Sequence, residues 1–181
     1  MPNTMHSDVL NNIENEIPRL RRYARYLARD ADKADDLVQD ALVSAVTKID
    51  QWQPNTNLRA WLMTILRNAF LNGYRRSKRE RLAMQDIASQ NIDFVPAQQE
   101  VQLVLNEVDQ AFHKLSEIHQ EVILLVAIEG LPYEEAADIT NVSVGTIKSR
   151  LSRARACLRD LVEEPDIISQ RSKLQRSNGH G

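Results

Sequence analysis

The chain has 181 residues, 43% of them hydrophobic, which is enough for one medium domain or two small ones with a buried core. Its five glycines, six prolines and 5% aromatic residues argue against an all-β sandwich or barrel, because such folds need many turns and aromatic strands. The formal net charge of -2, taken alone, argues against nucleic-acid binding, but the charge is unevenly distributed along the chain.

Several functional classes lack their usual signals. Cys157 is the only cysteine, so no internal disulfide is possible. No apolar run approaches 18 residues and no secretory signal precedes Val9, so we expect a cytoplasmic protein without a membrane span. The four histidines are scattered and the glycines form no phosphate-binding loop. We therefore expect no metal, no cofactor, no small-molecule substrate and no enzymatic activity.

Two amphipathic helices are predicted first. Apolar residues of the first recur at helical spacing at Ile13, Ile17, Leu20, Ala24 and Leu27. Pro18 is expected close to the start of this helix, where proline is tolerated. The second helix carries Ala34, Leu37, Val38, Ala41, Leu42, Ala45, Val46 and Ile49. Asp32 is its expected N-cap, and Asp35 and Asp36 suit the positive end of its dipole.

A third helix is predicted after the connector 51–56, with Asn57 as its cap. Its expected apolar stripe is Leu58, Trp61, Leu62, Ile65, Leu66 and Ala69. The helix continues into a segment, 67–81, with six basic residues and one acid, a net charge of +5. Asn68, Asn72 and Tyr74 in this segment could hydrogen-bond to unpaired bases or stack on them.

The middle of the chain is acidic. Residues 84–110 contain five acids and no lysine or arginine, a net charge of -5. The part up to Pro96 lacks periodicity and is typical of a linker, and helical spacing resumes at Val101. A further helix is predicted after Ser116, ending at Gly130, and two short helices follow it. We therefore predict an all-α fold of two small helical domains joined by an acidic linker.

The segment Tyr133–Leu161 carries the strongest pattern. Ala137 is small where two helices would cross closely, and Asn141 is expected in a left-handed turn. Ser143 fits the N-cap of the second helix, and Ile147 fits its apolar anchor. This arrangement predicts a helix-turn-helix.

The second helix of that motif separates an apolar face from a cationic one. Its expected core positions are Val144, Ile147, Leu151, Ala154, Leu158 and Leu161, and Cys157 is expected to be a small packing residue. Five basic residues and no acid lie in 146–159, interleaved with hydroxyl side chains that suit the major groove. A basic run is usually a solvated face, but here it coincides with the turn pattern, which favours DNA binding.

Three motifs, in this order, carry a resemblance to a known family. They are Asp35-Asp36-Leu37-Val38-Gln39-Asp40, Asn57-Leu58-Arg59-Ala60-Trp61-Leu62 and Val144-Gly145-Thr146-Ile147-Lys148-Ser149-Arg150-Leu151. The chain resembles an extracytoplasmic-function (ECF) sigma factor of bacterial RNA polymerase, closest to the alphaproteobacterial general stress response group. The resemblance implies a region 2 domain over 8–82, a linker over 83–99, a region 4 domain over 100–163 and a flexible tail over 164–181.

The resemblance also implies roles for individual residues. Core RNA polymerase would be bound by Asp35, Asp36, Leu37, Gln39 and Asp40, although these acids also suit the helix dipole. The minus-ten element would be bound by Asn57, Asn68, Asn72, Arg75, Arg76 and Arg79, whereas Trp61 is expected to pack in the core. The minus-thirty-five element would be bound by Ser143, Thr146, Lys148, Ser149, Arg150, Ser152 and Arg153.

The resulting expectation is a sigma factor that directs promoter-specific initiation in a stress response, under an anti-sigma factor. Lys148 replaces the arginine often found at its position, which argues against bidentate guanine readout there. Two alternatives stay open: a helix-turn-helix regulator that acts without polymerase, and a sigma-like decoy that sequesters an anti-sigma factor. A decoy needs no DNA-binding faces, and this chain has two cationic segments.

Overall fold

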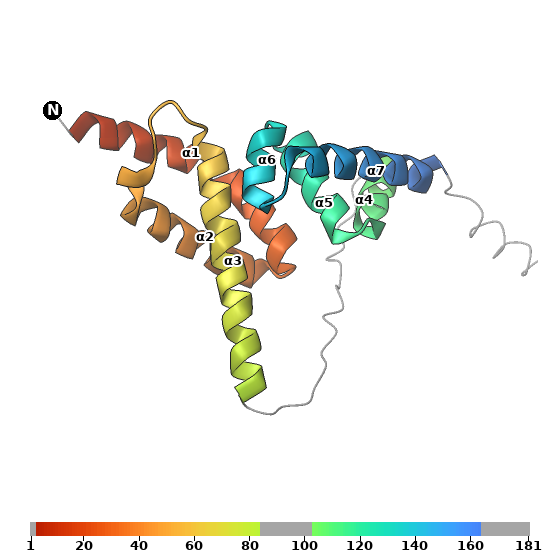
Figure 1. Cartoon of the computed structure of the whole chain (residues 1–181), viewed down its shortest axis with the longest axis horizontal. Helices are drawn as coiled ribbons and strands as arrows, with labels where there is room; N and C mark the ends of the chain where they lie inside the picture. Colours follow the sequence, from red (N-terminus) through yellow and green to blue (C-terminus); the bar gives the residue numbers. More distant parts are fainter. Residues whose placement is uncertain (1–2, 84–102, 164–181) are drawn as a thin grey trace, which may run out of the picture. The chain divides into compact units, whose positions relative to one another are not determined.

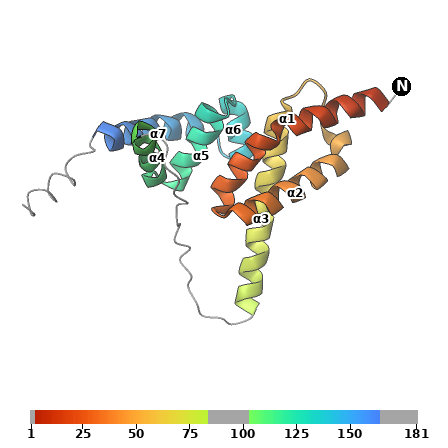
Figure 2. The ribbon, with the colours of Figure 1, turned by 180° about the vertical axis from the view of Figure 1, so that it is seen from behind.

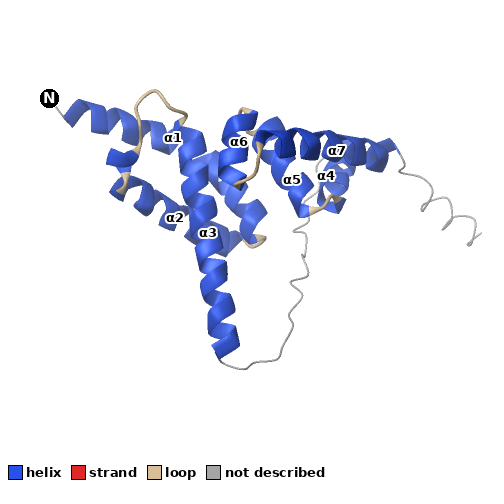
Figure 3. Cartoon of the chain, in the orientation of Figure 1, coloured by secondary structure: helices blue, strands red, loops and turns tan. Residues whose placement is uncertain are grey.

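The structure is a computed structural model that describes residues 3–83 and 103–163. The predicted tail (164–181) and the predicted linker (83–99), apart from Ala83, lie outside the described residues. The described part consists of helices, turns and loops without a strand, which confirms the all-α prediction (Figure 3). None of its helices is long and apolar enough to cross a membrane. The chain divides into two compact units.

The first unit contains α1 (Asn3–Ala28), α2 (Ala31–Thr47) and α3 (Leu58–Ala83), each of which contacts the other two (Figure 1). A 3-10 turn, η1 (Ile49–Gln51), leads from α2 into the connector before α3. The core consists of Val9, Ile13, Leu20, Tyr23, Ala24, Ala34, Val38, Ala41, Ala45, Leu62, Met63 and Leu66. Because α2 contributes three alanines, its backbone can approach α1 and α3 closely.

Two local predictions for this unit are wrong. Pro18 lies in the interior of α1 rather than near its start. The break that it causes in the hydrogen-bond ladder is tolerated because apolar residues on both sides of it, such as Ile13 and Leu20, pack in the core. The N-cap of α2 is Asp30 rather than Asp32, with its Oδ1 accepting the Lys33 N–H at 2.9 Å. Asp30 has the extended backbone that a cap needs, whereas Asp32 is already in the first helical turn.

The apolar stripes were predicted only in part. Val46 is 49% exposed, and Ile17 and Trp61 are half-buried rather than in the core. Met63, which the predicted stripe of α3 omitted, is fully buried. With three helices in contact, α3 buries the face that includes Leu62 and Met63, and this face is rotated from the predicted one toward Met63 and away from Trp61.

The C-terminal half of α3 has little packing. Its last fully buried residue among the described side chains is Leu66, and every side chain from Asn72 to Arg79 is exposed. A side chain added at Gly73 would meet no atom within 4 Å. In Figures 1 and 2 this half of the helix extends beyond α1 and α2. We call residues 72–79 the α3 extension.

The second unit contains α4 (Leu103–Lys114), α5 (Glu117–Val122), the π-helical segment η2 (Ile123–Ile128), most of α6 (Tyr133–Thr140) and α7 (Val144–Glu163). Both α4 and α5 contact α7. Its core includes Ala111, Leu115, Val122, Ile123, Leu124, Leu125, Leu131, Ile147, Leu151 and Ala154. The last of the two predicted short helices, α7, is in fact 20 residues long.

The predicted helix end at Gly130 is confirmed, although the π-helical turn before it was not expected. Gly130 has φ +70, and the Leu131 N–H donates to the Leu125 carbonyl at 3.1 Å. The Glu129 N–H donates to the Leu124 carbonyl five residues back, as in a π-helix.

Candidate nucleic-acid and protein interfaces

The turn between α6 and α7 has the predicted helix-turn-helix geometry. Asn141 has φ +56, the left-handed conformation expected for it. The Val142 N–H donates to the Ala137 carbonyl at 3.1 Å, which closes the turn. Ala137 and Ile147, the predicted crossing and anchor residues, are both buried. The local sequence therefore fixes the direction in which α7 leaves the turn.

The start of α7 is tied together by hydroxyl groups. Ser143 is the N-cap, as predicted, because its Oγ accepts the Thr146 N–H at 3.2 Å. The same Oγ lies 2.8 Å from Thr146 Oγ1, and Ser149 Oγ donates to the Thr146 carbonyl at 3.0 Å. These three hydroxyls order the first turn of the helix and would still be exposed or half-buried for contact with phosphates.

The faces of α7 separate clearly. Ile147, Leu151 and Ala154 are buried, while Ser149, Ser152 and Arg153 are exposed on the opposite side of the helix. Arg150 is half-buried beside this exposed face. Cys157 is also exposed, so its prediction as a packing residue is wrong. The residues predicted to read duplex DNA thus project from a helix whose other side is fixed in the core.

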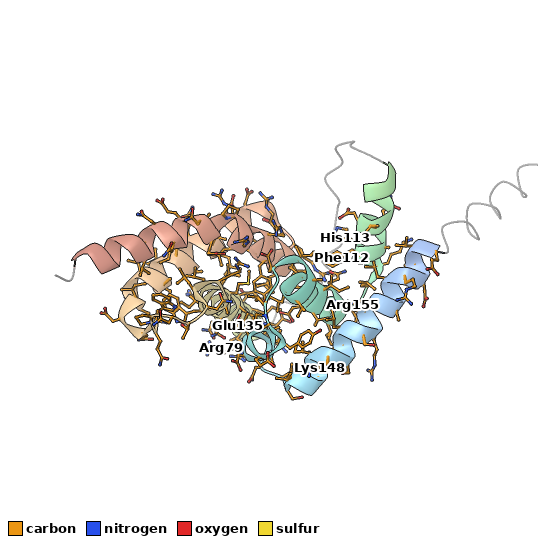
Figure 4. The ribbon with its side chains drawn as sticks, turned by 90° about the horizontal axis from the view of Figure 1, so that it is seen from above. Arg79, Phe112, His113, Glu135, Lys148 and Arg155 are labelled. Atoms are coloured by element: carbon orange, nitrogen blue, oxygen red, sulfur yellow. The ribbon has the colours of Figure 1, made fainter. Side chains whose placement is uncertain are left out.

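Lys148 lies on the flank of α7 rather than at the centre of its exposed face. Its Nζ lies 5.8 Å from the ring centroid of Tyr133 at the start of α6, within the range of a cation–π interaction. Figure 4 labels Lys148 and Arg155 on α7. This role of Tyr133 was not predicted, although its position as an aromatic residue at the start of the first helix is evident in the sequence.

Four of the predicted minus-ten residues form one stripe on α3. Asn68, Asn72, Arg75 and Arg79 are spaced by four, three and four residues, and all are exposed. The stripe lies opposite the buried side of the helix, and Arg79 Nε donates to the Arg75 carbonyl at 3.4 Å. Arg76 is also exposed but lies off this line. The amide groups at the start of this exposed stripe can hydrogen-bond to bases. The guanidinium groups at its end can donate hydrogen bonds to phosphates.

Asn57 caps α3, as predicted. Its Oδ1 accepts the Arg59 N–H at 3.1 Å and the Ala60 N–H at 3.4 Å, while the side chain stays exposed. In the connector that precedes it, the indole Nε1 of Trp52 is buried and has no hydrogen-bond partner in the described residues. A buried N–H of this kind is costly unless it is satisfied by a bound group.

An ion-pair network that the sequence analysis missed joins α1 to the start of α3. Arg59 Nε lies 2.8 Å from Glu16 Oε2, a second Arg59 nitrogen lies 3.3 Å from Oε1, and Arg19 lies 3.3 Å from both oxygens. Burial alone would raise the pKa of Glu16, but the hydrogen bonds and charges of Arg59 and Arg19 outweigh it and hold this pKa below its ordinary value. The pair is separated by 43 positions, so spacing gave no signal of it.

The predicted polymerase-binding residues share most of one face of α2. Asp36, Gln39 and Asp40 are exposed opposite the buried alanines, whereas Leu37 is half-buried. Asp35 lies at the edge, with its Oδ1 3.4 Å from Arg21 Nε. Val43, which was not among the predicted residues, is 68% exposed one turn after Gln39. An exposed apolar side chain beside polar groups fits a protein contact surface, whose centre is more apolar than its rim.

Metal ligands were not predicted, and the described residues contain no group of three or more His, Cys, Asp or Glu side chains that could hold a metal ion. His113 Nε2 lies 3.5 Å from Asp109 Oδ1 one helical turn earlier, and its ring packs edge-on against Phe112 (Figure 4). This histidine is accounted for by these local contacts.

Comparison with known proteins identifies both units. The sigma-70 region 2 family matches residues 13–80, and the sigma-70 region 4 family matches residues 105–158. The ECF RNA polymerase sigma factor EcfG of Rhodopseudomonas palustris (strain TIE-1) is 42% identical over 146 residues, which cover 81% of this chain and 80% of that protein. The chain belongs to the ECF sigma factors. The two family matches coincide with the two helical units described above.

Solved structures of ECF sigma factors agree with this assignment. The sigma factor RpoE, in complex with the anti-sigma factor NepR from Bartonella quintana, is 38% identical with a TM-score of 0.70. That match covers 87% of this chain and 98% of the RpoE chain. CnrH in complex with the cytosolic domain of CnrY is 29% identical with a TM-score of 0.58, covering 86% of this chain and 88% of CnrH.

These matches confirm the resemblance, the fold class and the sigma-factor function predicted from the sequence. ECF sigma factors are regulators of transcription initiation that act on RNA polymerase. The domain boundaries at 82, 99 and 163, and the roles of single residues in DNA and polymerase binding, stay predictions.

Proposed function

We propose that this ECF sigma factor binds core RNA polymerase in the cytoplasm and directs it to stress-response promoters, without catalysing a reaction itself. The helix-turn-helix of α6 and α7, with its hydroxyl and arginine side chains exposed opposite a buried face, is the observation that carries the proposal. A helix held in this way can lie in the major groove with its side chains set against base edges.

Region 4 would bind the minus-thirty-five element. Ser149, Ser152 and Arg153 at the centre of the exposed face would contact bases, with Lys148 at its edge. Ser143, Thr146 and Arg150 lie toward the start of the helix or its half-buried side and would contact phosphates.

Region 2 would hold the melted minus-ten element. Asn68 and Asn72 would contact unpaired bases, and Arg75, Arg76 and Arg79 of the α3 extension would contact the backbone. Asn57 lies beside the connector before α3 with its side chain exposed, where a flipped base would find a hydrogen-bond partner. Capturing unstacked bases biases the local duplex toward opening.

The exposed face of α2 would bind the polymerase through Asp35, Asp36, Leu37, Gln39 and Asp40. Polymerase would then hold the two domains at a fixed separation, so two weak DNA contacts act at high effective concentration. An anti-sigma factor is the expected regulator, because RpoE and CnrH, which this chain resembles, were solved with NepR and CnrY. A decoy that binds only such a regulator is the second candidate, but it would need neither cationic helix.

Transcription by purified core polymerase tests the proposal. Arg153→Ala should lower promoter-dependent initiation by about 5- to 100-fold, as expected for one lost base contact, while core-polymerase affinity stays unchanged. Arg155→Ala is the matched control, because it removes the same charge from the opposite flank of α7. Absence of stimulation by the wild-type protein on any genomic promoter would contradict the sigma-factor proposal and favour the decoy.

A further inference from the structure

A third cationic segment, on α1, has no role in the function proposed so far. Residues 17–29 contain five arginines and no acid, a net charge of +5. This equals the charge of each of the two segments assigned to promoter DNA. The neighbouring Glu14, Glu16 and Asp30 partly offset this charge over a longer window.

Three of the five arginines share one exposed surface. Arg21, Arg22 and Arg25 are exposed and, with Pro18, line a hollow of about 370 Å³. They lie three, four and seven residues after Pro18, so they stand on one side of α1. The short rigid proline ring leaves open the space between the long side chains that follow it. We call Pro18, Arg21, Arg22 and Arg25 the α1 arginine face.

The positive charge of this face comes from a segment, 17–29, that contains no acid. Arg19 points elsewhere, because its guanidinium is bonded to Glu16 beside Arg59. Arg21 lies 3.4 Å from Asp35, but both side chains are about half exposed, so this pair is weak. Arg21, Arg22 and Arg25 thus bring three positive charges to one exposed surface.

The chemistry of the face fits a polyanion better than a protein. The large apolar side chain exposed on the described part of α1 is Leu10, two turns before Pro18, so the face has no apolar anchor of the kind that carries protein interfaces. It also lacks the hydroxyl and amide groups that accompany the arginines of α7 and the α3 stripe. A positively charged surface without side chains that recognise base edges suits phosphates, and its binding carries no sequence preference.

We propose that the α1 arginine face binds the phosphate backbone of promoter DNA, independently of sequence, as a third DNA contact of this protein. The proposal rests on the proposed function, since it concerns the same promoter complex. It assigns to α1 a contribution to affinity and to salt dependence, whereas sequence recognition belongs to α3 and α7.

The test compares two double variants that each remove two positive charges. Arg22→Ala/Arg25→Ala removes two of the three guanidinium groups of the face and keeps the Arg21–Asp35 pair. The control is Lys48→Ala/Lys114→Ala, at exposed positions outside the three basic segments. Each protein is assembled with core polymerase, and its affinity for a promoter fragment is measured over a range of KCl concentrations. The free full-length chains are measured in parallel on duplex DNA of arbitrary sequence.

The arginine variant should bind DNA roughly tenfold more weakly, with the slope of log K against log salt reduced by about 0.9 for each lost phosphate contact. The loss should be the same for promoter and arbitrary sequences. Arg22→Lys/Arg25→Lys should restore most of the affinity, because a phosphate contact needs a cation rather than a guanidinium fork. Circular dichroism establishes that all variants are folded.

Three results would overturn the proposal. An unchanged salt slope in the arginine variant means that α1 meets no phosphates. An equal loss in the lysine control means that net charge, not this face, sets the affinity. A loss of polymerase affinity at an unchanged DNA slope means that the face binds an acidic protein surface. If the wild-type holoenzyme transcribes no promoter, the proposed function fails, and the salt slopes of the free chains still test the α1 face.

Discussion

The basic segments 146–159 of α7 and 67–81 of α3, which includes the α3 extension, carry the same net charge of +5 but are packed very differently. Ile147, Leu151 and Ala154 hold α7 against the core along most of its basic segment. The α3 extension has no buried side chain and continues beyond the helices that pack the first half of α3 (Figure 2). A packed helix presents its side chains in fixed positions, which duplex readout requires, whereas an unpacked helix can adjust to a single strand whose path varies.

Charge makes both segments candidate nucleic-acid surfaces, and packing decides which kind of nucleic acid each would suit. In α7 the same buried residues, Ile147, Leu151 and Ala154, stabilise the domain and position the side chains that would contact bases. For the α3 extension these two roles are separable, because stability comes from the residues up to Leu66 and contact from those after it.

The largest expected difference concerns the core of α7. Leu151 is 2% exposed, so Leu151→Ala should lower the free energy of unfolding by about 2–5 kcal/mol, because it leaves a cavity. Tyr74→Ala in the α3 extension, where Tyr74 is 61% exposed, should change it by less than about 0.5 kcal/mol. Urea denaturation measures both, and similar losses would contradict the contrast between the two helices.

The Glu16–Arg59 ion pair at the start of α3 should make the stability of the first unit depend on pH. The pKa of Glu16 is held low in the folded protein, so its contribution is full above the unfolded pKa of about 4.3 and is lost as the pH falls through the lower folded value. Glu16→Gln should cost about 1–2 kcal/mol at neutral pH, since the Arg59 side chain loses a charged partner. The variant should also lose less stability on acidification than the wild type, as urea titrations from pH 6 to lower pH would show.

Two glycine substitutions should change the free energy of unfolding in opposite directions. Gly130→Ala should cost about 1 kcal/mol, because Gly130 ends its helix with φ +70. Gly73→Ala should instead stabilise the α3 extension by about 0.5–1 kcal/mol, because it removes a flexible residue where nothing obstructs a side chain. Amide hydrogen exchange over 72–79 should slow in Gly73→Ala, and faster exchange there would show that the extension is not a free-standing helix.

The smallest effect is expected at the edge of α7. Tyr133→Leu removes the ring under Lys148 and should weaken minus-thirty-five binding by about 0.5–1 kcal/mol, since the ammonium group is then less well placed. Tyr133→Phe keeps the ring face and should bind as the wild type does. Fluorescence anisotropy with a duplex minus-thirty-five site measures both, and equal losses would assign Tyr133 to its hydroxyl instead.

Local signals predicted much of this protein because they act within a few residues. The caps at Asn57 and Ser143, the left-handed Asn141 and the helix end at Gly130 each depend on backbone chemistry that the residue itself supplies. Asp32 was the wrong cap because two aspartates lay two positions apart and only the backbone distinguishes them.

Features that depend on distant partners could not be predicted in this way. The Glu16–Arg59 pair joins α1 to α3, and nothing in the spacing of either residue marks it. The exposure of Trp61 and Val46 depends on which faces of the three helices meet. The spacing of apolar residues predicts the buried face of a helix only to within about one residue. The π-helical turn at Ile123–Ile128 has no composition that distinguishes it from an α-helix.

The exposed α3 extension also bears on the lifetime of the protein. A helical segment whose side chains are all exposed opens at little cost in free energy, and an opened segment rich in arginine and lysine is a ready substrate for proteases. Single-stranded DNA bound along Asn72, Arg75 and Arg79 would shield this segment while the protein is engaged at a promoter. Cleavage there would separate the two regions, so unengaged copies would be removed faster than engaged ones.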